Sequence, residues 1–252
     1  MLFAIDIGNT NIVLGLFKGD NILEKWRIAT DLKKTADEYF IIFENLLKDL
    51  LEKIDSAIFS SVVPELDFVF NDIFLKKFNL KPIIVNYNLK LNIKLRYRNP
   101  AEIGADRIVN AVAASEIYKP PLIIIDFGTA NTVCFVDKDY NYYGGLILPG
   151  INILRDTLHR WTAKLPKVSV IKPDSIIADN TVGAIQNGIY YQTVGGINYI
   201  IDLILKNYEK SSKIILTGGL ANLFKDDIDY DVIFDPDLTL KGLNIIYKLN
   251  KG

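Results

Sequence analysis

The sequence has very few of the side chains on which metal-centred and nucleophilic catalysis most often depend. It holds one cysteine, Cys134, and one histidine, His159, in 252 residues. One cysteine cannot form an intramolecular disulfide, and its apolar neighbours in Thr132–Val136 predict a small core residue. The histidine has polar neighbours, which predicts a surface or interface position. A Cys/His zinc site or a Ser-His-Asp or Cys-His catalytic group is therefore not expected.

Strong net charge and long hydrophobic runs are also missing. Lys and Arg number 29, Asp and Glu number 30, and the formal net charge is −1, so no global field favours nucleic acid or an anionic membrane. Apolar runs such as Leu122–Ile125 are far shorter than the ~20 residues needed to span a bilayer. No secretory signal is visible at the start of the sequence. We expect a soluble, cytoplasmic protein that binds neither nucleic acid nor membrane.

Two common phosphate-binding motifs are absent as well. The sequence has no Gly-x-x-x-x-Gly-Lys-[Ser/Thr] loop and no Gly-x-Gly-x-x-Gly loop, which argues against P-loop and Rossmann sites. Half of the residues are hydrophobic, and their spacing predicts an α/β protein. Strands are predicted at 2–6, 12–17, 22–28, 57–63, 82–85, 122–126, 132–136, 143–148, 213–217 and 232–234. Helices are predicted at 35–51, 65–78, 151–160, 181–205 and 238–248.

An internal repeat is the most informative feature. Asp6-Ile-Gly-Asn-Thr10 and Asp126-Phe-Gly-Thr-Ala130 lie 120 residues apart, each after an apolar run and before a β-like run. The same offset aligns Val13 with Val133. Such a repeat predicts two similar α/β halves with equivalent loops on either side of a cleft, where ligands usually bind.

Each repeated loop has the features of a phosphate or cation site. Glycine lets the backbone approach a ligand closely. Neighbouring N–H groups and a hydroxyl, Thr10 in one copy and Thr129 or Thr132 in the other, can donate to phosphate oxygens. Asp6 or Asp126 at the strand end can hold a cation, directly or through water. A tight hairpin with a turn-forming aspartate is the alternative, and the presence of two matched copies argues against it.

Two further segments have residues suited to ligand binding. Thr217-Gly-Gly219 ends a predicted strand and could lie against an adenosine, although a plain strand–helix turn has the same pattern. In Asn99–Arg107, Arg107 is suited to binding an anionic substrate, and Asp106 could accept a hydroxyl proton as a general base. A solvated helix start with a favourably placed acidic residue is the alternative for this segment.

Together these motifs resemble the type III pantothenate kinases, members of the actin/hexokinase/Hsp70-like superfamily, and the resemblance spans nearly the whole chain. It rests on Asp6–Asn11, Ser60–Pro64, Tyr97–Arg107, Asp126–Ala130, Gly144-Gly145, Pro149-Gly150, Thr162–Pro166, Asn180-Thr181, Thr217–Gly219 and Leu238–Leu243. The Gly104-Ala-Asp-Arg107 element separates this family from other actin-like kinases. The implied fold is a duplicated ribonuclease H-like (actin-like ATPase) fold, with domains at 1–118 and 119–252 flanking a nucleotide cleft.

The resemblance implies ATP-dependent phosphorylation of pantothenate to 4′-phosphopantothenate, the first step of coenzyme A synthesis. Asp106 is implied as the catalytic base. The implied ATP-binding residues are Asp6, Ile7, Gly8, Asn9, Thr10, Asn11, Ile12, Val13 and Thr129. The implied substrate-binding residues are Tyr97, Gly104, Ala105, Asp106, Arg107 and Thr181, the last reaching the site from the second subunit of a homodimer.

The resemblance also implies two kinds of cation. Asp6 would help to place Mg²⁺ with ATP, indirectly, and Asp126 would coordinate a monovalent cation, K⁺ or NH₄⁺. Asn131 departs from the family, which usually has threonine there, and this leaves the finer ATP contacts open.

Two alternative functions remain at this point. A kinase for another small hydroxylated or acidic metabolite would share the loops, and a non-catalytic regulator or structural member of the family would share the fold. Separately, Ile185, Ile189 and Tyr190 form an apolar helix face, which could contact a partner subunit or belong to the core.

Overall fold

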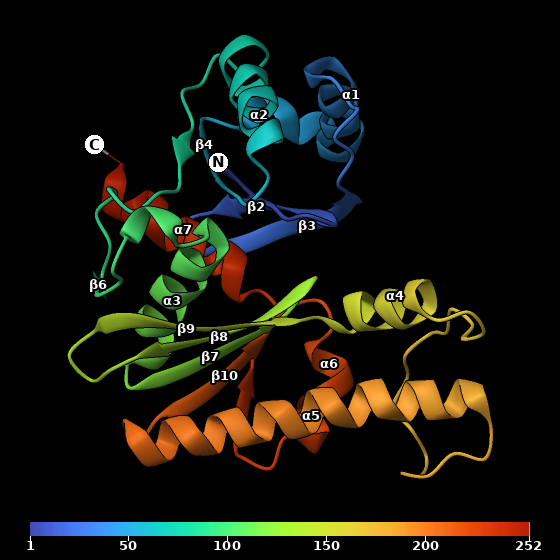
Figure 1. The fold of residues 1–252 in the computed structure, drawn as a ribbon. Helices are drawn as coiled ribbons and strands as arrows, with labels where there is room; N and C mark the ends of the chain where they lie inside the picture. The colour runs from blue at the N-terminus through green and yellow to red at the C-terminus, as the bar shows by residue number, and fades with distance from the viewer. Residues whose placement is uncertain (252) are drawn as a thin grey trace. The chain divides into compact units, whose positions relative to one another are not determined.

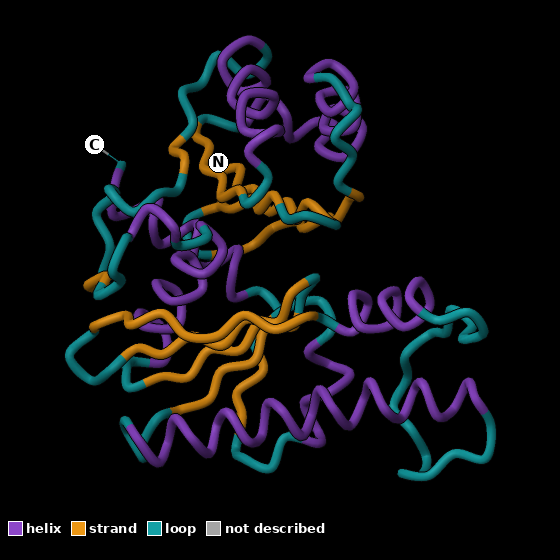
Figure 2. The backbone as a smooth tube through the Cα atoms, viewed as in Figure 1, coloured by secondary structure: helices purple, strands orange, loops and turns teal. Residues whose placement is uncertain are grey.

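The structure is a computed structural model that describes residues 1–251 (Figures 1 and 2). The chain forms two compact units. The first unit contains residues 1–116 and the C-terminal segment that begins at Asp237, and the second contains Ile117–Pro236. This division differs from the expected domains, 1–118 and 119–252, because the segment that begins at Asp237 belongs to the first unit. Helix α7 (Leu238–Asn250) packs against strands of the first unit, a long-range contact that no local pattern encodes.

The first unit is a five-stranded mixed sheet with helices. Its strands are β1 (Leu2–Ile7), β2 (Asn11–Lys18), β3 (Asn21–Ala29), β4 (Ser56–Ser61) and β5 (Ile83–Ile84), in the order β3-β2-β1-β4-β5. Strand β1 is antiparallel to β2 and parallel to β4. The remaining elements are α1 (Ala36–Leu47), α2 (Pro64–Lys76), α3 (Ala105–Tyr118), the 3₁₀ turns η1 (Lys48–Lys53) and η2 (Pro100–Glu102), and the short strand β6 (Lys94–Leu95). The strands and helices expected here are confirmed within a few residues.

Helix α1 shows how local sequence fixes an element of this unit. The Thr35 hydroxyl accepts a hydrogen bond from the backbone N–H of Glu38 at 3.3 Å, and Glu38 accepts one from the backbone N–H of Thr35 at 2.8 Å. This reciprocal capping box satisfies two N–H groups that a helix start would leave unpaired. Tyr39, Phe43 and Leu47, spaced four residues apart, are buried against the sheet together with side chains from α2.

The second unit repeats this plan around another mixed sheet. Its strands are β7 (Leu122–Phe127), β8 (Ala130–Val136), β9 (Asn141–Pro149), β10 (Lys213–Thr217) and β11 (Val232–Phe234), in the order β11-β10-β7-β8-β9. Its helices are α4 (Ile151–Trp161), α5 (Thr181–Asn207), α6 (Ala221–Phe224) and the 3₁₀ turn η3 (Lys225–Asp227). As in the first unit, the central strand β7 has one antiparallel neighbour, β8, and one parallel neighbour, β10.

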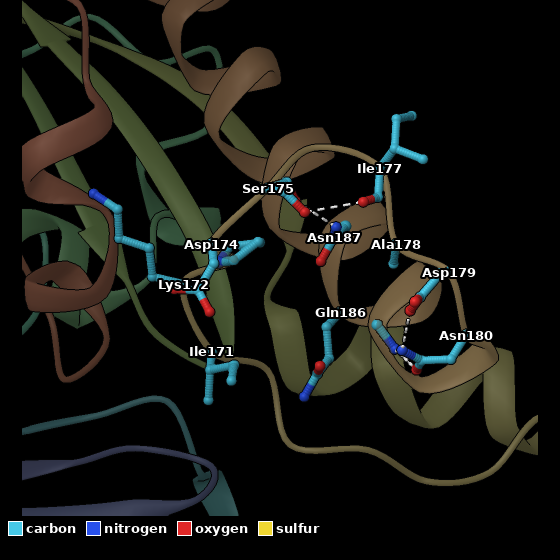
Figure 3. Close-up of a pocket in the computed structure, with 12 residues that line it drawn as sticks. Ile171, Lys172, Asp174, Ser175, Ile177, Ala178, Asp179, Asn180, Gln186 and Asn187 are labelled. Carbon is cyan, nitrogen blue, oxygen red and sulfur yellow. Dashed lines mark hydrogen bonds between the residues drawn. The ribbon is translucent and has the colours of Figure 1, made fainter.

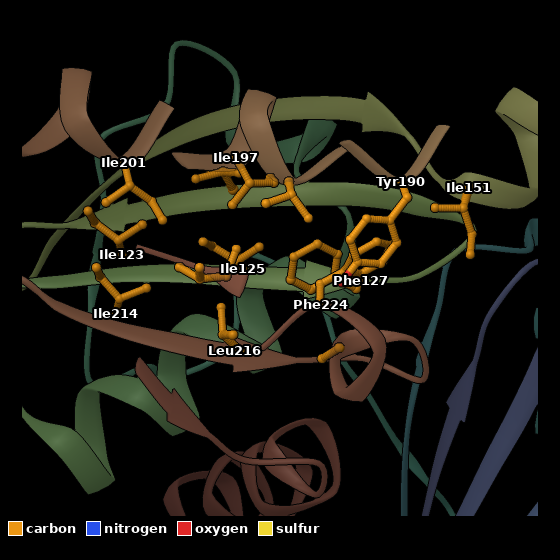
Figure 4. Close-up of a cluster of buried hydrophobic side chains, with 14 of the residues drawn as sticks. Ile123, Ile125, Phe127, Ile151, Tyr190, Ile197, Ile201, Ile214, Leu216 and Phe224 are labelled. Atoms are coloured by element: carbon orange, nitrogen blue, oxygen red, sulfur yellow. The ribbon is translucent and has the colours of Figure 1, made fainter. Parts of the chain in front are cut away.

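Helix α5 covers one face of the second sheet. Figure 4 shows Tyr190, Ile197 and Ile201 of α5 facing Ile123 and Ile125 of β7 in one buried cluster. Since every second strand residue points to the same face, Ile124 and Asp126 of β7 lie on the opposite face.

The apolar side chains near the start of α5 belong to this core. Ile185, Ile189 and Tyr190 are all buried within the cluster. The hypothesis that this helix face belongs to the core is therefore confirmed for these residues, and the hypothesis that it contacts a partner subunit is wrong. Cys134 is buried as predicted.

The register of the second hairpin corrects the residue-by-residue alignment of the repeat. Asp6 lies opposite Val13 in the first unit, but Asp126 lies opposite Thr132, not Val133. The loop between β7 and β8 is one residue shorter than the loop between β1 and β2. Because strand side chains alternate, a shift of one residue moves a different side chain onto the face of the aspartate.

The segment between α4 and α5, residues 162–180, contains neither helix nor strand. We call it the strap. His159, at the end of α4, is exposed, and its Nδ1 lies 2.9 Å from the carbonyl oxygen of Leu165 in the strap. Among residues 1–251, none of the helices combines the length and the hydropathy that crossing a bilayer requires.

Candidate active site

Asp6 lies at the carboxyl end of β1, the central strand of the first unit, and is half-buried. Ser60 of the parallel strand β4 is directly opposite, and its hydroxyl donates a hydrogen bond to Asp6 Oδ1 at 2.7 Å. Ser60 is fully buried. A carboxylate at the end of parallel strands, where ligands of open α/β sheets bind, is thus held in one orientation.

The loop after Asp6 is a tight turn with a second anchor. The Gly8 N–H donates to the Asn11 carbonyl at 3.0 Å, and the Thr30 hydroxyl donates to the Gly8 carbonyl at 2.6 Å. A Cβ on Gly8 would lie 3.0 Å from that same Asn11 oxygen, so glycine permits the close approach. Thr30 was not among the predicted site residues, because it lies 22 residues from Gly8 in the sequence and only the fold brings the two together.

The predicted phosphate-binding residues range from exposed to fully buried, with Asp6, Gly8, Asn11 and Val13 half-buried. Asn9 and Thr10 are exposed at the tip of the loop. Ile7 and Ile12 are fully buried in the core. Any contact of these two isoleucines with a ligand would therefore go through their backbone groups, because their side chains pack inward.

Asp106 lies in the first turn of α3. Its Oδ1 accepts a hydrogen bond from the Arg107 backbone N–H at 2.7 Å. Burial raises the pKa of the Asp106 carboxyl above its ordinary value of 3.8, and this N–H and the charge of Arg107 oppose the rise in part. A carboxylate with a raised pKa accepts a proton more readily than an ordinary aspartate, as a general base requires.

The start of α3 lies beside the ends of β1 and β4 in the same unit. The Val62 N–H, just after β4, donates to the Ile7 carbonyl at 3.0 Å. A Cβ built on Gly104 would lie 3.6 Å from the Val62 side chain and 2.6 Å from Asp106 Oδ1. Val62 therefore connects the Asp6 loop to the Gly104–Arg107 element.

The other predicted substrate residues of the first unit differ in exposure. Ala105 and Arg107 are buried, with Arg107 at 5% exposure. Tyr97 is half-buried and lies in the irregular segment between β6 and η2. A buried guanidinium one residue after a carboxylate provides a fixed positive charge at this end of α3.

Asp126 has the same position in the second unit as Asp6 in the first. It lies at the end of β7, opposite Thr217 of the parallel strand β10. Gly218 follows with φ of 94°, and a Cβ there would lie 2.3 Å from Asp126 Oδ1. Only glycine fits this positive φ without strain and leaves room for the carboxylate.

Thr129 lies in the short turn between β7 and β8, and Asn131 is the second residue of β8. Thr129 is exposed, and its carbonyl accepts a hydrogen bond from the Gly150 N–H at 3.1 Å. Asn131, the departure from the family pattern, is 3% exposed. Thr129 is thus exposed at the surface, whereas the asparagine side chain is enclosed.

Thr181 is exposed at the first turn of α5, just after the N-cap Asn180, whose side chain accepts a hydrogen bond from the Gly183 N–H at 2.8 Å. Beside it the strap and α5 enclose a pocket of about 410 Å³ (Figure 3). Asn187 of α5 holds the strap there, because its Nδ2 donates to the carbonyls of Ser175 and Ile176 at 2.7 and 3.0 Å. The pocket is lined by Ile171, Lys172, Pro173, Asp174, Ser175, Ile177, Ala178, Asp179, Asn180, Gly183, Gln186 and Asn187.

Sequence comparison decides the family to which these features belong. Residues 2–203 match the sequence profile of the type III pantothenate kinases. The chain belongs to the type III pantothenate kinase family. As a family member it is a kinase that uses a nucleotide and a small-molecule substrate, which confirms the coarser part of the functional prediction.

Solved structures support the fold of this family member. The chain resembles a protein described as a Baf-family transcriptional activator from Campylobacter jejuni, with 21% identity, a TM-score of 0.60 and coverage of 98% of this chain and 97% of that one. It also resembles a protein described as a 2-dehydro-3-deoxygalactonokinase from Sinorhizobium meliloti, with 13% identity, a TM-score of 0.65 and coverage of 98% and 96%. A protein described as an N-acetylglucosamine kinase from Porphyromonas gingivalis matches with 11% identity, a TM-score of 0.54 and coverage of 98% of both chains. These likenesses confirm the duplicated ribonuclease H-like fold.

Proposed function

We propose that this kinase phosphorylates pantothenate with ATP to give 4′-phosphopantothenate, the first step of coenzyme A synthesis. The observation that carries the proposal is the Asp106 carboxylate, whose pKa burial raises, at the start of α3 beside the ends of β1 and β4. The family match supplies the substrate class. Phosphoryl transfer asks little covalent chemistry of the protein, so a correctly placed base and fixed charges are the main requirements.

Asp106 accepts the proton of the pantothenate hydroxyl as that oxygen attacks the γ-phosphate of ATP. Its bond from the Arg107 backbone N–H fixes one oxygen and leaves the other as the proton acceptor. Arg107 contributes positive charge for the pantothenate carboxylate. Tyr97, Gly104 and Ala105 complete the substrate-binding segment.

The Asp6–Val13 loop binds the ATP phosphates. Its exposed part, Asn9 and Thr10, provides N–H and hydroxyl donors for phosphate oxygens. Asp6, oriented by Ser60, fits a Mg²⁺ that arrives with the nucleotide, because Mg²⁺ usually keeps waters and phosphate oxygens and needs only one or two carboxylates. When bound, the ion neutralises phosphate charge, and Asp6 helps to hold it in place. Thr129, which is exposed, contributes a further hydroxyl to ATP.

Asp126 binds a monovalent cation, K⁺ or NH₄⁺. A single carboxylate among neutral side chains suits one positive charge better than two. The close approach of Gly218 to Asp126 Oδ1 supports a fixed carboxylate at this position.

We further propose a homodimer in which Thr181 enters the substrate site of the partner subunit. Large apolar side chains of α4 and the strap are open to solvent, including Trp161 at 84% and Ile177 at 81% exposure. Contiguous exposed apolar side chains mark protein–protein surfaces, and a dimer contact at these residues would bury them. They lie in the same unit as Thr181, on the segments that border it in sequence.

A substrate panel tests the proposed reaction. ADP release should require pantothenate and should be near background with sugars, acetate or no acceptor. A protein that releases ADP equally well with a sugar would be a kinase of another small metabolite. Saturable ATP binding with no ADP release for any acceptor would favour a regulator, the role described for the structurally similar C. jejuni protein.

A further inference from the structure

Equivalent hydroxyl groups in the two units differ in their hydrogen bonding. In the first unit, Ser60 lies opposite Asp6 on the parallel neighbour strand and donates to its carboxylate at 2.7 Å. In the second unit, Thr217 occupies the same position opposite Asp126. Within the described residues, however, the buried Oγ1 of Thr217 has no hydrogen-bond partner.

An unpartnered hydroxyl at this depth is costly. Thr217 is 1% exposed, and buried polar groups in native proteins are nearly always hydrogen-bonded, since leaving one unsatisfied loses its interaction with water. A group of this kind, in a position where the other repeat forms a hydrogen bond, has an oxygen available to a ligand.

The sheet places a third oxygen-bearing side chain in the same row. Thr132 of β8 lies opposite Asp126 on its other side and is also buried. Neighbouring residues in register point to the same face. That face is the one away from α5, because Ile125, Val133 and Leu216, next to the three residues in sequence, all lie in the core beneath α5. Thr132, Asp126 and Thr217 therefore form one row across β8, β7 and β10.

The carboxylate in this row leans toward β10. A Cβ on Gly218 would lie 2.3 Å from Asp126 Oδ1, and a Cβ on Gly128 would lie 3.7 Å from the same atom. The oxygen is thus close to the backbone that directly follows Thr217. One carboxylate and two neutral hydroxyls carry a single negative charge, which matches a monovalent cation.

We propose that Thr217 Oγ1 is, with Asp126, a ligand of the monovalent cation. The proposal rests on the cation site of the proposed function and adds one specific ligand to it. Thr217, unlike Ser60, does not donate to its aspartate, so the lone pairs of its oxygen can face an ion bound by the carboxylate.

The test compares Thr217→Val with Thr217→Ser and with Thr193→Val as a matched control. Valine has the shape of threonine but no hydroxyl, and serine restores the hydroxyl. Thr193 is a buried threonine of the same unit whose hydroxyl already donates to the Ile189 carbonyl at 2.8 Å. The full chain would be titrated with KCl against choline chloride at constant ionic strength, with and without Mg-ADP. The readout is the midpoint of thermal unfolding, since a ligand of the folded state raises it.

We expect K⁺ to raise the midpoint of the wild type, of Thr217→Ser and of Thr193→Val. Thr217→Val should need at least about tenfold more K⁺ for the same rise, an effect of the size that altered metal sites commonly show. Without K⁺, Thr217→Val should be as stable as the wild type or more stable, because it loses an unsatisfied hydroxyl.

The proposal would be overturned if K⁺ raised the unfolding midpoint of Thr217→Val as much as that of the wild type. It would also be overturned if K⁺ did not change the wild-type midpoint either with or without Mg-ADP. The proposed reaction is judged separately, by pantothenate-dependent ADP release. A wild type that releases ADP without any K⁺-dependent stabilisation contradicts the ligand assignment alone. A protein that K⁺ stabilises, but whose ADP release does not depend on pantothenate, contradicts the proposed reaction alone.

Discussion

Ser60 donates a hydrogen bond to Asp6 across two parallel strands, with 2.7 Å between the hydroxyl oxygen and the carboxylate oxygen Oδ1. The pair joins the centre of the first sheet to the loop proposed to bind phosphate. Because Ser60 is fully buried, the bond is shielded from water and holds the carboxylate in one orientation.

Replacement of Ser60 should therefore affect both stability and ATP use. Ser60→Ala should lower the free energy of unfolding by about 1–3 kcal/mol, the usual cost of removing a partner from a buried charged acceptor. The KM for Mg-ATP should rise, while the KM for pantothenate stays near the wild-type value. Ser56→Ala, at the half-buried start of the same strand, is the control, and equal ATP kinetics in the two variants would contradict the positioning role of Ser60.

Asp106→Asn separates catalysis from stability. Turnover should fall by about 10²–10⁴-fold, because asparagine cannot accept the hydroxyl proton. The thermal midpoint at neutral pH should rise, because the folded state no longer holds a carboxylate whose charged form burial disfavours. Steady-state kinetics and thermal unfolding of the same preparation measure both effects. A fully active variant would remove Asp106 from the role of base.

The pH dependence follows from the direction of the same pKa shift. Only ionised Asp106 accepts a proton, so kcat/KM should fall with a slope of one as the pH drops through its raised pKa. Protonation of Asp106 has the opposite effect on stability, because it favours the folded state. A pKa that is higher in the folded state means tighter proton binding when folded, so ionisation destabilises the protein as the pH rises from the unfolded pKa through the folded one.

The stability gain of Asp106→Asn should therefore shrink as the pH is lowered toward the ordinary aspartate value of 3.8. Thermal melts of wild type and variant across this range measure the difference. A gain that is constant with pH would show that the ionisation of Asp106 is not its cause.

Gly218→Ala should damage the Asp126 site. Its φ of 94° strains any residue with a Cβ, and that Cβ would meet Asp126 Oδ1 at 2.3 Å. We expect a loss of more than about 1 kcal/mol in the free energy of unfolding, together with weaker activation by K⁺. Gly188→Ala is the matched control. Gly188 lies within α5 with nothing near its Cβ position, so alanine there should stabilise by roughly 0.5–1 kcal/mol.

Replacement of Asn187 tests whether the strap contributes to substrate binding. Asn187→Asp removes the two hydrogen bonds that Nδ2 donates to strap carbonyls and puts a negative charge beside them. Amide hydrogens of residues 171–179 should exchange faster, and the KM for pantothenate should rise more than the KM for ATP. Asn207→Asp, which removes a donor to the Leu203 carbonyl at the far end of α5, should leave both KM values unchanged. Faster exchange without any change in pantothenate KM would separate the strap from the substrate site.

Local elements of this fold could be predicted from the sequence because their signals are local. The capping box at Thr35 and the glycine turns before β2 and β8 act within four residues, so they fixed the start of α1 and both hairpins. The repeat was visible because Asp and Gly recur at one offset. The pairing of Asp126 with Thr132 was not visible, because a one-residue difference in loop length changes the register without changing the motif.

The features that needed the structure depend on long-range pairing. Ser60 and Thr217 lie 54 and 91 residues from the aspartates that they face, and only the parallel pairings β1–β4 and β7–β10 bring them into register. The raised pKa of Asp106 likewise comes from burial, which its polar neighbours in sequence do not indicate. The packing of α7 on the first unit is a third case of this kind.

The most direct test of the central claim is detection of the product itself. Wild-type protein, Mg-ATP, K⁺ and pantothenate would be incubated, and the reaction followed by phosphorus NMR and mass spectrometry. We predict one new phosphomonoester with the mass of 4′-phosphopantothenate, formed in equal amount to ADP, at a rate about 10²–10⁴-fold lower with Asp106→Asn. ADP formation without a phosphorylated pantothenate, or equal product from the wild type and the variant, would contradict the account.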